Sequence, residues 1–232
     1  MEKATDRLEI LIGKDALTAL AAAKVVLVGL GGVGGQAAEA VARSFVGTLV
    51  LIDGDKVAVS NINRQILSTA ENVGKEKALI AAERIKAINP AAKVTALPLF
   101  LTEGNIPQLD IWDADVIVDA IDDLPAKLAL IKEATLRGTK IISSMGAANR
   151  LDPTAFKVAD ISETHTCPLA KKLRRELAEQ GITKGVRVVY STERPASFGG
   201  ALGSNAFVPP AAGLLLAKAA VDAILSPATK KD

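Results

Sequence analysis

Five glycines between residues 29 and 35 form the densest group of residues in this sequence that could do chemistry. Gly29, Gly31 and Gly34 match the spacing GxGxxG, with Gly32 in the same turn, after an apolar run and before a helix-like run. Residues without a Cβ atom allow a tight turn and let backbone N–H groups approach a phosphate at the positive end of the helix. The pattern predicts a nucleotide phosphate site.

An acidic residue stands where such a site needs one. Asp53 ends the next apolar run, about 19 residues past the glycine loop, and a carboxylate there can accept hydrogen bonds from a ribose hydroxyl. NAD and ATP both present an adenosine ribose followed by phosphates, so these two features leave the choice between them open.

A polar cluster after Asp53 favours a triphosphate. The run from Gly54 to Gln65 contains Asp55, Asn61 and Arg64, and Lys77 follows near a predicted helix start. An arginine can fork onto phosphate oxygens and a lysine can add a point charge, which together suit a leaving pyrophosphate. The alternative for Arg64 is an ordinary solvated surface side chain.

Acidic residues also follow the fourth predicted strand. Asp119 is followed closely by Asp122 and Asp123, at the carboxyl edge where open α/β sheets bind ligands. Carboxylates there suit Mg²⁺, which bridges phosphate oxygens and neutralises charge as an acyl group displaces pyrophosphate. The alternative is that Asp122 or Asp123 caps the helix that begins near Pro125.

The elements that must position these residues alternate along the chain, which predicts an α/β fold: a Rossmann-like, mostly parallel sheet with helices on both faces. We expect a single domain over residues 1–232, with a nucleotide-binding half at about 1–150 and a substrate and dimer half at about 151–232. The predicted strands are Lys24–Val28, Thr48–Ile52, Val94–Leu99, Val116–Asp119, Lys140–Ser143 and Arg187–Tyr190. The predicted helices are Gly34–Ser44, Lys75–Ile88, Pro125–Arg137, Pro168–Glu179 and Pro210–Leu225.

Composition narrows the classes of function. One cysteine and one histidine exclude an internal disulfide, a four-cysteine zinc site and paired-histidine metal motifs. A net charge of +2 is too small to indicate nucleic-acid binding by itself. The charged start of the chain lacks an apolar signal core, so we expect a cytoplasmic protein. Lys218 and Asp222 interrupt the apolar stretch at 207–225, which favours a packed helix over a membrane span.

Two further groups are ambiguous on residue type alone. Cys167 precedes Pro168 at a predicted helix start, where the helix dipole could lower its pKa, and His165 could face it. Burial as an inert thiol is the commoner fate of a free cysteine. A basic cluster on the same helix suits either a phosphate backbone or solvent, and it comprises Lys171, Lys172, Arg174 and Arg175.

Taken together, these motifs resemble the ThiF superfamily of ubiquitin-activating-like adenylating enzymes over nearly the whole chain. The likeness rests on Gly29–Gly34, Ile52–Asp55, Asn61–Gln65, Val73–Lys77 and Asp119–Asp122. It implies ATP as the nucleotide, ribose binding by Asp53, and a magnesium-linked role for Asp122. It implies triphosphate contacts from Asn61, Arg64, Gln65 and Lys77. Asp123 replaces a frequent asparagine of the superfamily, which leaves its role open.

Within the superfamily, the second half resembles the tRNA threonylcarbamoyladenosine dehydratases. The similar segments are Ser144–Ala148, Leu151–Pro153, Val158–Ile161, Thr166–Lys171 and Val189–Glu193. The resemblance implies adenylation of the threonylcarbamoyl carboxylate on the modified adenosine beside the tRNA anticodon. Cyclisation with net loss of water would follow, with release of AMP and pyrophosphate. It is this likeness, and not the basic cluster, that favours tRNA as substrate.

The resemblance also implies a homodimer. Arg7 is expected before the first helix, as a finger that reaches the ATP of the partner subunit, and the alternative is a mobile surface arginine. Three rival functions stay open: activation of a ubiquitin-like sulfur carrier, a nicotinamide-dependent oxidoreductase, and a nucleotide-binding module without chemistry. The missing CxxC pairs argue against the first. The sequence leaves open whether a sulfur-transfer partner takes part.

Overall fold

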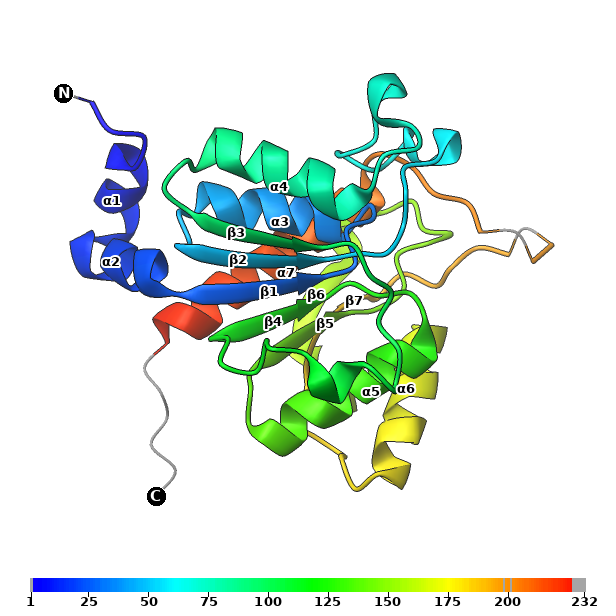
Figure 1. The fold of residues 1–232 in the computed structure, drawn as a ribbon. Coiled ribbons are helices and arrows are strands. Elements are labelled where there is room, and N and C mark those ends of the chain that lie inside the picture. Colours follow the sequence, from blue (N-terminus) through cyan, green and yellow to red (C-terminus); the bar gives the residue numbers. More distant parts are fainter. Residues whose placement is uncertain (1, 198, 201, 227–232) are drawn as a thin grey trace, which may run out of the picture.

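A single sheet runs through the computed structural model, which describes residues 2–197, 199–200 and 202–226. Its strand order is β3-β2-β1-β4-β5-β7-β6, and every pairing is parallel except that of β6 with β7 (Figure 1). The strands are β1 Lys24–Val28, β2 Thr48–Ile52, β3 Lys93–Leu97, β4 Val116–Asp119, β5 Ile141–Ser144, β6 Phe156–Asp160 and β7 Arg187–Ser191. The α/β fold expected from the sequence is confirmed.

Helices cover both faces of the sheet. On one face lie α3 (Gly34–Arg43), α4 (Lys77–Ile88) and α7 (Val208–Leu225), and on the other lie α5 (Leu124–Arg137) and α6 (Pro168–Glu179) (Figure 1). Two short helices, α1 (Asp6–Ile12) and α2 (Lys14–Ala22), precede β1. The 3₁₀ turns are η1 Val59–Asn61, η2 Ala70–Asn72, η3 Ile106–Gln108, η4 Pro153–Ala155 and η5 Ile161–Glu163.

The core is divided between the two faces of the sheet. Val25 and Leu27 of β1 belong to the apolar cluster beneath α3 and α7, while Val26 and Val28 belong to the cluster beneath α5 and α6. Side chains alternate sides along a strand, so a strand that is covered on both faces must be apolar throughout. This requirement explains the uninterrupted apolar runs in the sequence.

The strand order reverses direction at β1, and this reversal positions the site. The chain moves outward from β1 to β2 and β3, then returns to place β4 on the other side of β1. Ligands of open α/β sheets bind at the carboxyl ends of the strands at such a switch point. The glycine loop follows β1 and the turn 120–123 follows β4, so both belong to this crevice.

Most predicted elements are present with ends shifted by one or two residues, but three elements were not predicted. Helices α1 and α2 are short, α1 buries no residue and α2 buries only Leu20, so burial leaves little periodic signal in their sequences. Strand β6 lies at the sheet edge with mostly exposed or half-buried residues. The expectation that Arg7 precedes the first helix was wrong, because it lies inside α1.

Helix α7 is long and apolar enough to cross a membrane by length and composition, and it is the one such helix in the described part of the chain. It packs on α3 and on strands β4 to β7, with 44% of its residues buried. Lys218 Nζ lies 2.6 Å from Asp222 Oδ2, which is the i,i+4 pair expected from the sequence. These contacts are those of a packed helix.

Candidate functional site

Two glycines of the phosphate loop are required by close backbone packing. Gly29 has a φ of +80°, and a Cβ atom there would lie 2.7 Å from the carbonyl oxygen of Ala120. A Cβ atom at Gly34 would lie 1.7 Å from the Gly29 carbonyl oxygen. At Gly31 the nearest atom would be Gln65 Nε2 at 3.6 Å. The first two glycines therefore shape the turn, and Gly31 leaves its backbone open to the cleft.

Asp53 is hydrogen-bonded to the backbone at the start of the phosphate loop. One carboxylate oxygen accepts a hydrogen bond from the Leu30 N–H at 2.6 Å, and the other accepts from the Asp55 N–H at 2.8 Å. Burial raises the pKa of the Asp53 carboxyl, while these two N–H groups and the nearby Lys77 charge act in the opposite direction. A carboxylate oxygen can accept more than one bond, so ribose binding by Asp53 stays a prediction.

The basic residues of the cleft are held by neighbours. Arg64 Nη1 donates to the Ser60 carbonyl oxygen at 2.8 Å and to Asn63 Oδ1 at 3.0 Å. Lys77 is buried, and its ammonium lies 2.8 Å from Asp55 Oδ2. Fixing these cations in advance lowers the entropic cost of binding a polyanion.

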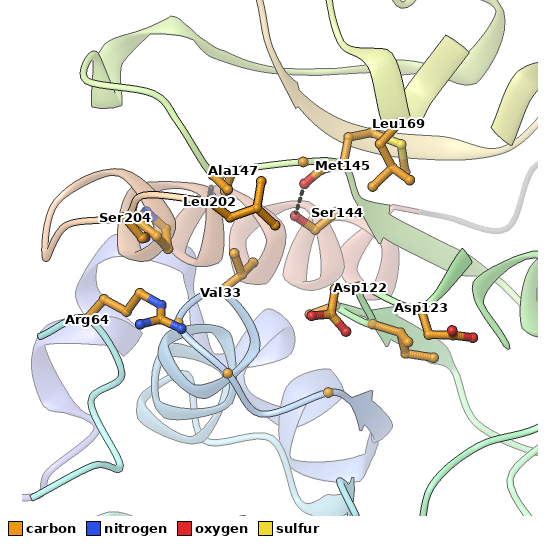
Figure 2. A pocket seen from close by; sticks show the side chains of 18 of the residues that line it. Val33, Arg64, Asp122, Asp123, Ser144, Met145, Ala147, Leu169, Leu202 and Ser204 are labelled. Carbon is orange, nitrogen blue, oxygen red and sulfur yellow. Dashed lines mark hydrogen bonds between the residues drawn. The ribbon is translucent and has the colours of Figure 1, made fainter. Parts of the chain in front are cut away.

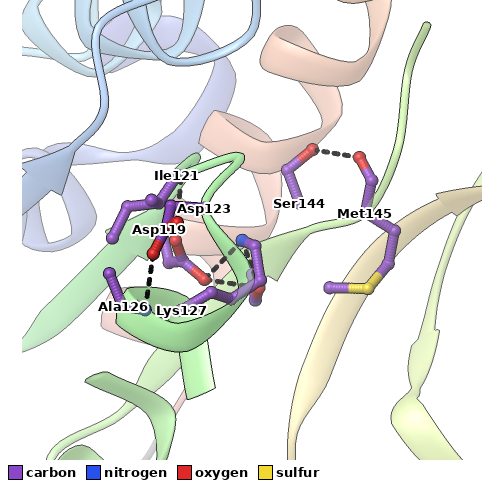
Figure 3. A network of polar contacts seen from close by, with 8 residues as sticks. Asp119, Ile121, Asp123, Ala126, Lys127, Ser144 and Met145 are labelled. Atoms are coloured by element: carbon purple, nitrogen blue, oxygen red, sulfur yellow. Dashed lines mark hydrogen bonds and ion pairs between the residues drawn. The ribbon is translucent and has the colours of Figure 1, made fainter. Parts of the chain in front are cut away.

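The three acids after β4 have three different environments. Asp119 is fully buried and accepts from Lys127 Nζ at 2.7 Å and from Ser143 Oγ at 2.6 Å (Figure 3). Asp123 caps α5 by accepting from the Ala126 N–H at 2.9 Å. Asp122 is exposed and, among the described contacts, forms neither a cap nor an ion pair. Asp123 is therefore the residue that caps α5, and the carboxylate of Asp122 remains available to a ligand in the cleft.

The buried ion pair was missed by reasoning from the sequence. Lys127 joins α5 to the ends of β4 and β5, and Asp119 Oδ1 also accepts from the Ile121 N–H at 3.0 Å, which fixes the turn that carries Asp122 (Figure 3). The sequence did contain one indication that Lys127 is buried. Lys127 lies three and four residues before Leu130 and Ile131, on the buried stripe of its helix, where a lysine is unusual without a partner.

Cys167 is a buried thiol at the start of α6 and caps no backbone group. The His165 ring contacts Tyr190 edge-on, with ring centroids 5.4 Å apart. Within the described residues no hydrogen bond joins the Cys167 thiol to that imidazole. The geometry does not support a catalytic pair of Cys167 and His165, which agrees with the interpretation of Cys167 as an inert thiol.

One large cleft brings most of the predicted residues together, with a volume of about 1190 Å³. Arg64 and Asp122 flank Val33 of the phosphate loop (Figure 2). The predicted residues that line the cleft are Gly29, Gly31, Gly32, Asp53, Asp55, Asn61, Arg64, Gln65, Lys77 and Asp122. Gly34 lies in the packed turn, and Arg7 is not among the lining residues.

The cleft extends beyond the nucleotide-binding half of the chain. Its far wall contains residues 144–150 and, from the predicted second half of the chain, residues 167–169, 195–197, 200 and 202–204. In Figure 2, Met145 and Leu169 lie on the side of the cleft away from Arg64. Small-molecule sites occupy about 300–1,000 Å³, so this cleft has room for a nucleotide and part of a second substrate.

The donor set is compatible with magnesium held mainly by phosphate. Among the described residues no group of three or more acidic, histidine or cysteine side chains could hold a metal ion by itself. Mg²⁺ commonly binds one or two carboxylates together with substrate phosphates, and keeps several waters. The free carboxylate of Asp122 at the cleft fits that arrangement.

Comparisons with known proteins agree with this geometry. The chain is 42% identical over 228 residues to a tRNA threonylcarbamoyladenosine dehydratase of Bacillus subtilis, covering 90% of each chain. The structure matches that of a tRNA N6-threonylcarbamoyladenosine dehydratase of Escherichia coli in complex with ATP, with a TM-score of 0.90 and 37% identity over 97% of this chain and 94% of that one. A sulfur carrier protein adenylyltransferase of Thermus thermophilus is 36% identical, over 61% of this chain and 51% of its own length.

The family model described as the ThiF family matches residues 5–231, which includes the glycine loop, the polar cluster and the far wall of the cleft. The match extends through both halves of the chain. This chain therefore belongs to the ThiF family.

Proposed function

We propose that this protein is an ATP-dependent dehydratase that acts on threonylcarbamoyladenosine beside the anticodon of tRNA. The observation that carries the proposal is a single cleft that joins the phosphate loop to a wall from the second half of the chain. The E. coli and B. subtilis relatives with this name are similar along nearly the whole chain. The likeness to the sulfur carrier adenylyltransferase covers a smaller share.

In the proposed reaction the substrate carboxylate attacks the α-phosphorus of ATP and displaces pyrophosphate. A nucleophile within the same modified nucleoside then attacks the acyl carbon and loses its proton to solvent. The former carboxylate oxygen leaves with AMP, so the nucleoside loses one water in total. The chain supplies position and charge, and no covalent bond to the protein is needed.

Each cleft residue has a role in this proposal. The open backbone at Gly31 approaches the phosphates together with the neighbouring Gly32, and Asp53 binds the ribose. Arg64 and Lys77 stabilise the charge that develops on pyrophosphate, with Asn61 and Gln65 as further polar contacts. Asp122 would hold Mg²⁺, which supplies charge neutralisation between phosphate oxygens when bound.

We further propose that the enzyme works as a homodimer in the cytoplasm, with Arg7 reaching the ATP of the partner subunit. Helix α2 packs at the amino ends of the strands, where the Gly47 N–H donates to the Leu20 carbonyl oxygen, so α1 lies away from the phosphate loop of its own chain (Figure 1). Ile10 and Leu11 of α1 are 86% and 80% exposed. A second subunit would cover them.

The decisive experiment is incubation with ATP, Mg²⁺ and tRNA that carries threonylcarbamoyladenosine, followed by mass analysis of the nucleosides. We expect loss of one water that depends on ATP and is matched by release of AMP and pyrophosphate. Unmodified tRNA is the control. Unchanged nucleoside, together with pyrophosphate exchange stimulated by a carrier protein with a Gly-Gly tail, would instead establish the sulfur-carrier function.

A further inference from the structure

A second hollow adjoins the cleft at the start of α6. Its volume is about 340 Å³, and it is lined by His165, Thr166, Cys167, Pro168, Lys171 and Arg174. Cys167 and Pro168 also line the main cleft, so the two hollows share a wall. A substrate whose reacting group lies in the cleft can therefore place an adjacent part here.

The charge of this hollow is positive. Lys171 and Arg174 are cationic, and no carboxylate is among the described residues that line it. The helical neighbours of Lys171 at i+3 and i+4 are Arg174 and Arg175, so its own helix offers it no acid. Glu176 and Glu179 pair with Arg175 instead. Like charges so close are unfavourable unless an anion binds among them.

The basic residues of α6 have different roles in the structure. The guanidinium of Arg174 donates to the Thr164 carbonyl oxygen at 2.9 Å and so holds the wall of the hollow together. Lys171 is exposed and has no ion-pair partner among the described residues, which leaves it as the cation available to a ligand. Lys172 is also exposed but lies outside the hollow.

We infer that this hollow binds a backbone phosphate of the tRNA substrate, next to the modified nucleotide, with Lys171 as the main contact and His165 as a second donor. The inference rests on the proposed function. Phosphate contacts position a nucleic acid, and an unpaired lysine suits that role because it presents a compact charge. A phosphate of ATP is the other chemical source, and the experiment separates the two.

The test compares Lys171→Ala with Lys172→Ala, which remove the same charge from adjacent positions of one exposed helical surface. Lys171→Arg is the conservative variant. For each protein we would measure kcat and KM for modified tRNA, direct binding of tRNA at several salt concentrations, and ATP affinity by calorimetry.

We expect Lys171→Ala to weaken tRNA binding and raise KM for tRNA about tenfold, since a hydrogen bond to a charged group contributes at least the energy of one order of magnitude in affinity. The kcat and the ATP affinity should not change. The dependence of log affinity on log salt should become shallower by roughly 0.7–0.9, as for the loss of one phosphate contact. Lys172→Ala should leave the slope unchanged, and Lys171→Arg should restore most of the affinity.

Equal effects of Lys171→Ala and Lys172→Ala would overturn the inference, because they would indicate a diffuse electrostatic surface. Weaker ATP binding in Lys171→Ala with tRNA binding unchanged would assign the hollow to the nucleotide. If the wild-type protein leaves modified tRNA unchanged, the proposed dehydratase function fails. The comparison of direct tRNA binding between the two lysine variants then still decides whether the hollow contacts tRNA.

Discussion

At the scale of single residues, the cleft is a set of charges fixed before any ligand arrives. Lys77 is buried against Asp55, and Arg64 is anchored on the Ser60 carbonyl oxygen. Neither side chain therefore has to be ordered from a mobile, solvated state when a triphosphate binds. Preorganised charge of this kind acts where charge develops in a transition state.

We therefore expect Arg64→Ala and Lys77→Ala each to lower turnover by about 10²–10³ while the protein stays folded, because each removes one of the contacts proposed for the leaving pyrophosphate. Lys75→Ala is the matched control, since Lys75 lies just before α4 but outside the cleft, bonded to Asn72. Single-turnover kinetics would measure the loss of turnover, and thermal unfolding would show whether each variant stays folded. Turnover near wild type in either cleft variant would place that cation outside the reaction.

Cys167→Ala is expected to keep most of the activity, because the proposed acyl adenylate is resolved within the substrate and not on a protein thiol. The thiol is buried and its hydrogen-bond partners do not include His165. Activity and unfolding temperature would be measured together. Complete loss of activity in a variant that unfolds like the wild type would contradict this mechanism and favour thioester chemistry.

The sequence indicates those candidate site residues that are recognisable by their type and spacing, such as the glycines of the phosphate loop and Asp53. It does not indicate Lys127 as one of them, because a lysine in a helix is usually a surface residue and its partners Asp119 and Ser143 lie on two different strands. Nor could spacing choose between Asp122 and Asp123 as the helix cap, since that depends on the backbone path at one turn.

At the scale of elements, the helices and strands could be predicted where burial imposes a regular pattern of apolar residues on the sequence. Strands β1, β2 and β4 are covered on both faces, so their apolar runs give their exact residue ranges. Prediction failed for α1, which buries nothing, and for β6, an edge strand whose pairing with β7 is the one antiparallel pairing in the described sheet. Such elements are determined by contacts that a single sequence does not display.

Gly213 joins the last helix to the phosphate loop. A Cβ atom there would lie 2.3 Å from the Val33 carbonyl oxygen and 2.9 Å from Gln36 Cβ. We expect Gly213→Ala to cost about 1–3 kcal/mol of unfolding free energy, as overpacking does, and to weaken ATP binding because Val33 belongs to the loop.

Urea unfolding and ATP calorimetry measure these two effects. The matched control is Gly104→Ala, because a Cβ atom at Gly104 would meet nothing nearer than Thr102 Oγ1 at 4.0 Å. If Gly213→Ala unfolds and binds ATP like Gly104→Ala, the contact between α7 and the loop is less tight than the structure indicates.

At the scale of the whole molecule, α1 lies near the amino ends of the strands (Figure 1), whereas the cleft is lined by residues at the carboxyl ends of β1, β2 and β4. An Arg7 that takes part in catalysis is therefore expected to act on another subunit. We expect Arg7→Ala and Arg64→Ala proteins to be nearly inactive separately and to recover about a quarter of wild-type activity when mixed equally. About half of the dimers are then mixed, and each has one intact site.

The mixing experiment needs subunit exchange, which native mass spectrometry of the mixture would verify. No recovery in exchanged dimers would mean that Arg7 acts within its own chain or not at all. Full activity of the Arg7→Ala protein alone would show that the finger assignment is wrong.

The packing of α7 on the phosphate loop also bears on how the protein is made. The glycine loop is synthesised early, yet Pro209 and Gly213, which lie against Gly32 and Val33, come from the last helix of the described chain. Chains emerge at about 5–20 residues per second and fold from the N-terminus. A nascent chain therefore cannot complete the packing of its phosphate loop until α7 has been synthesised and has left the ribosome.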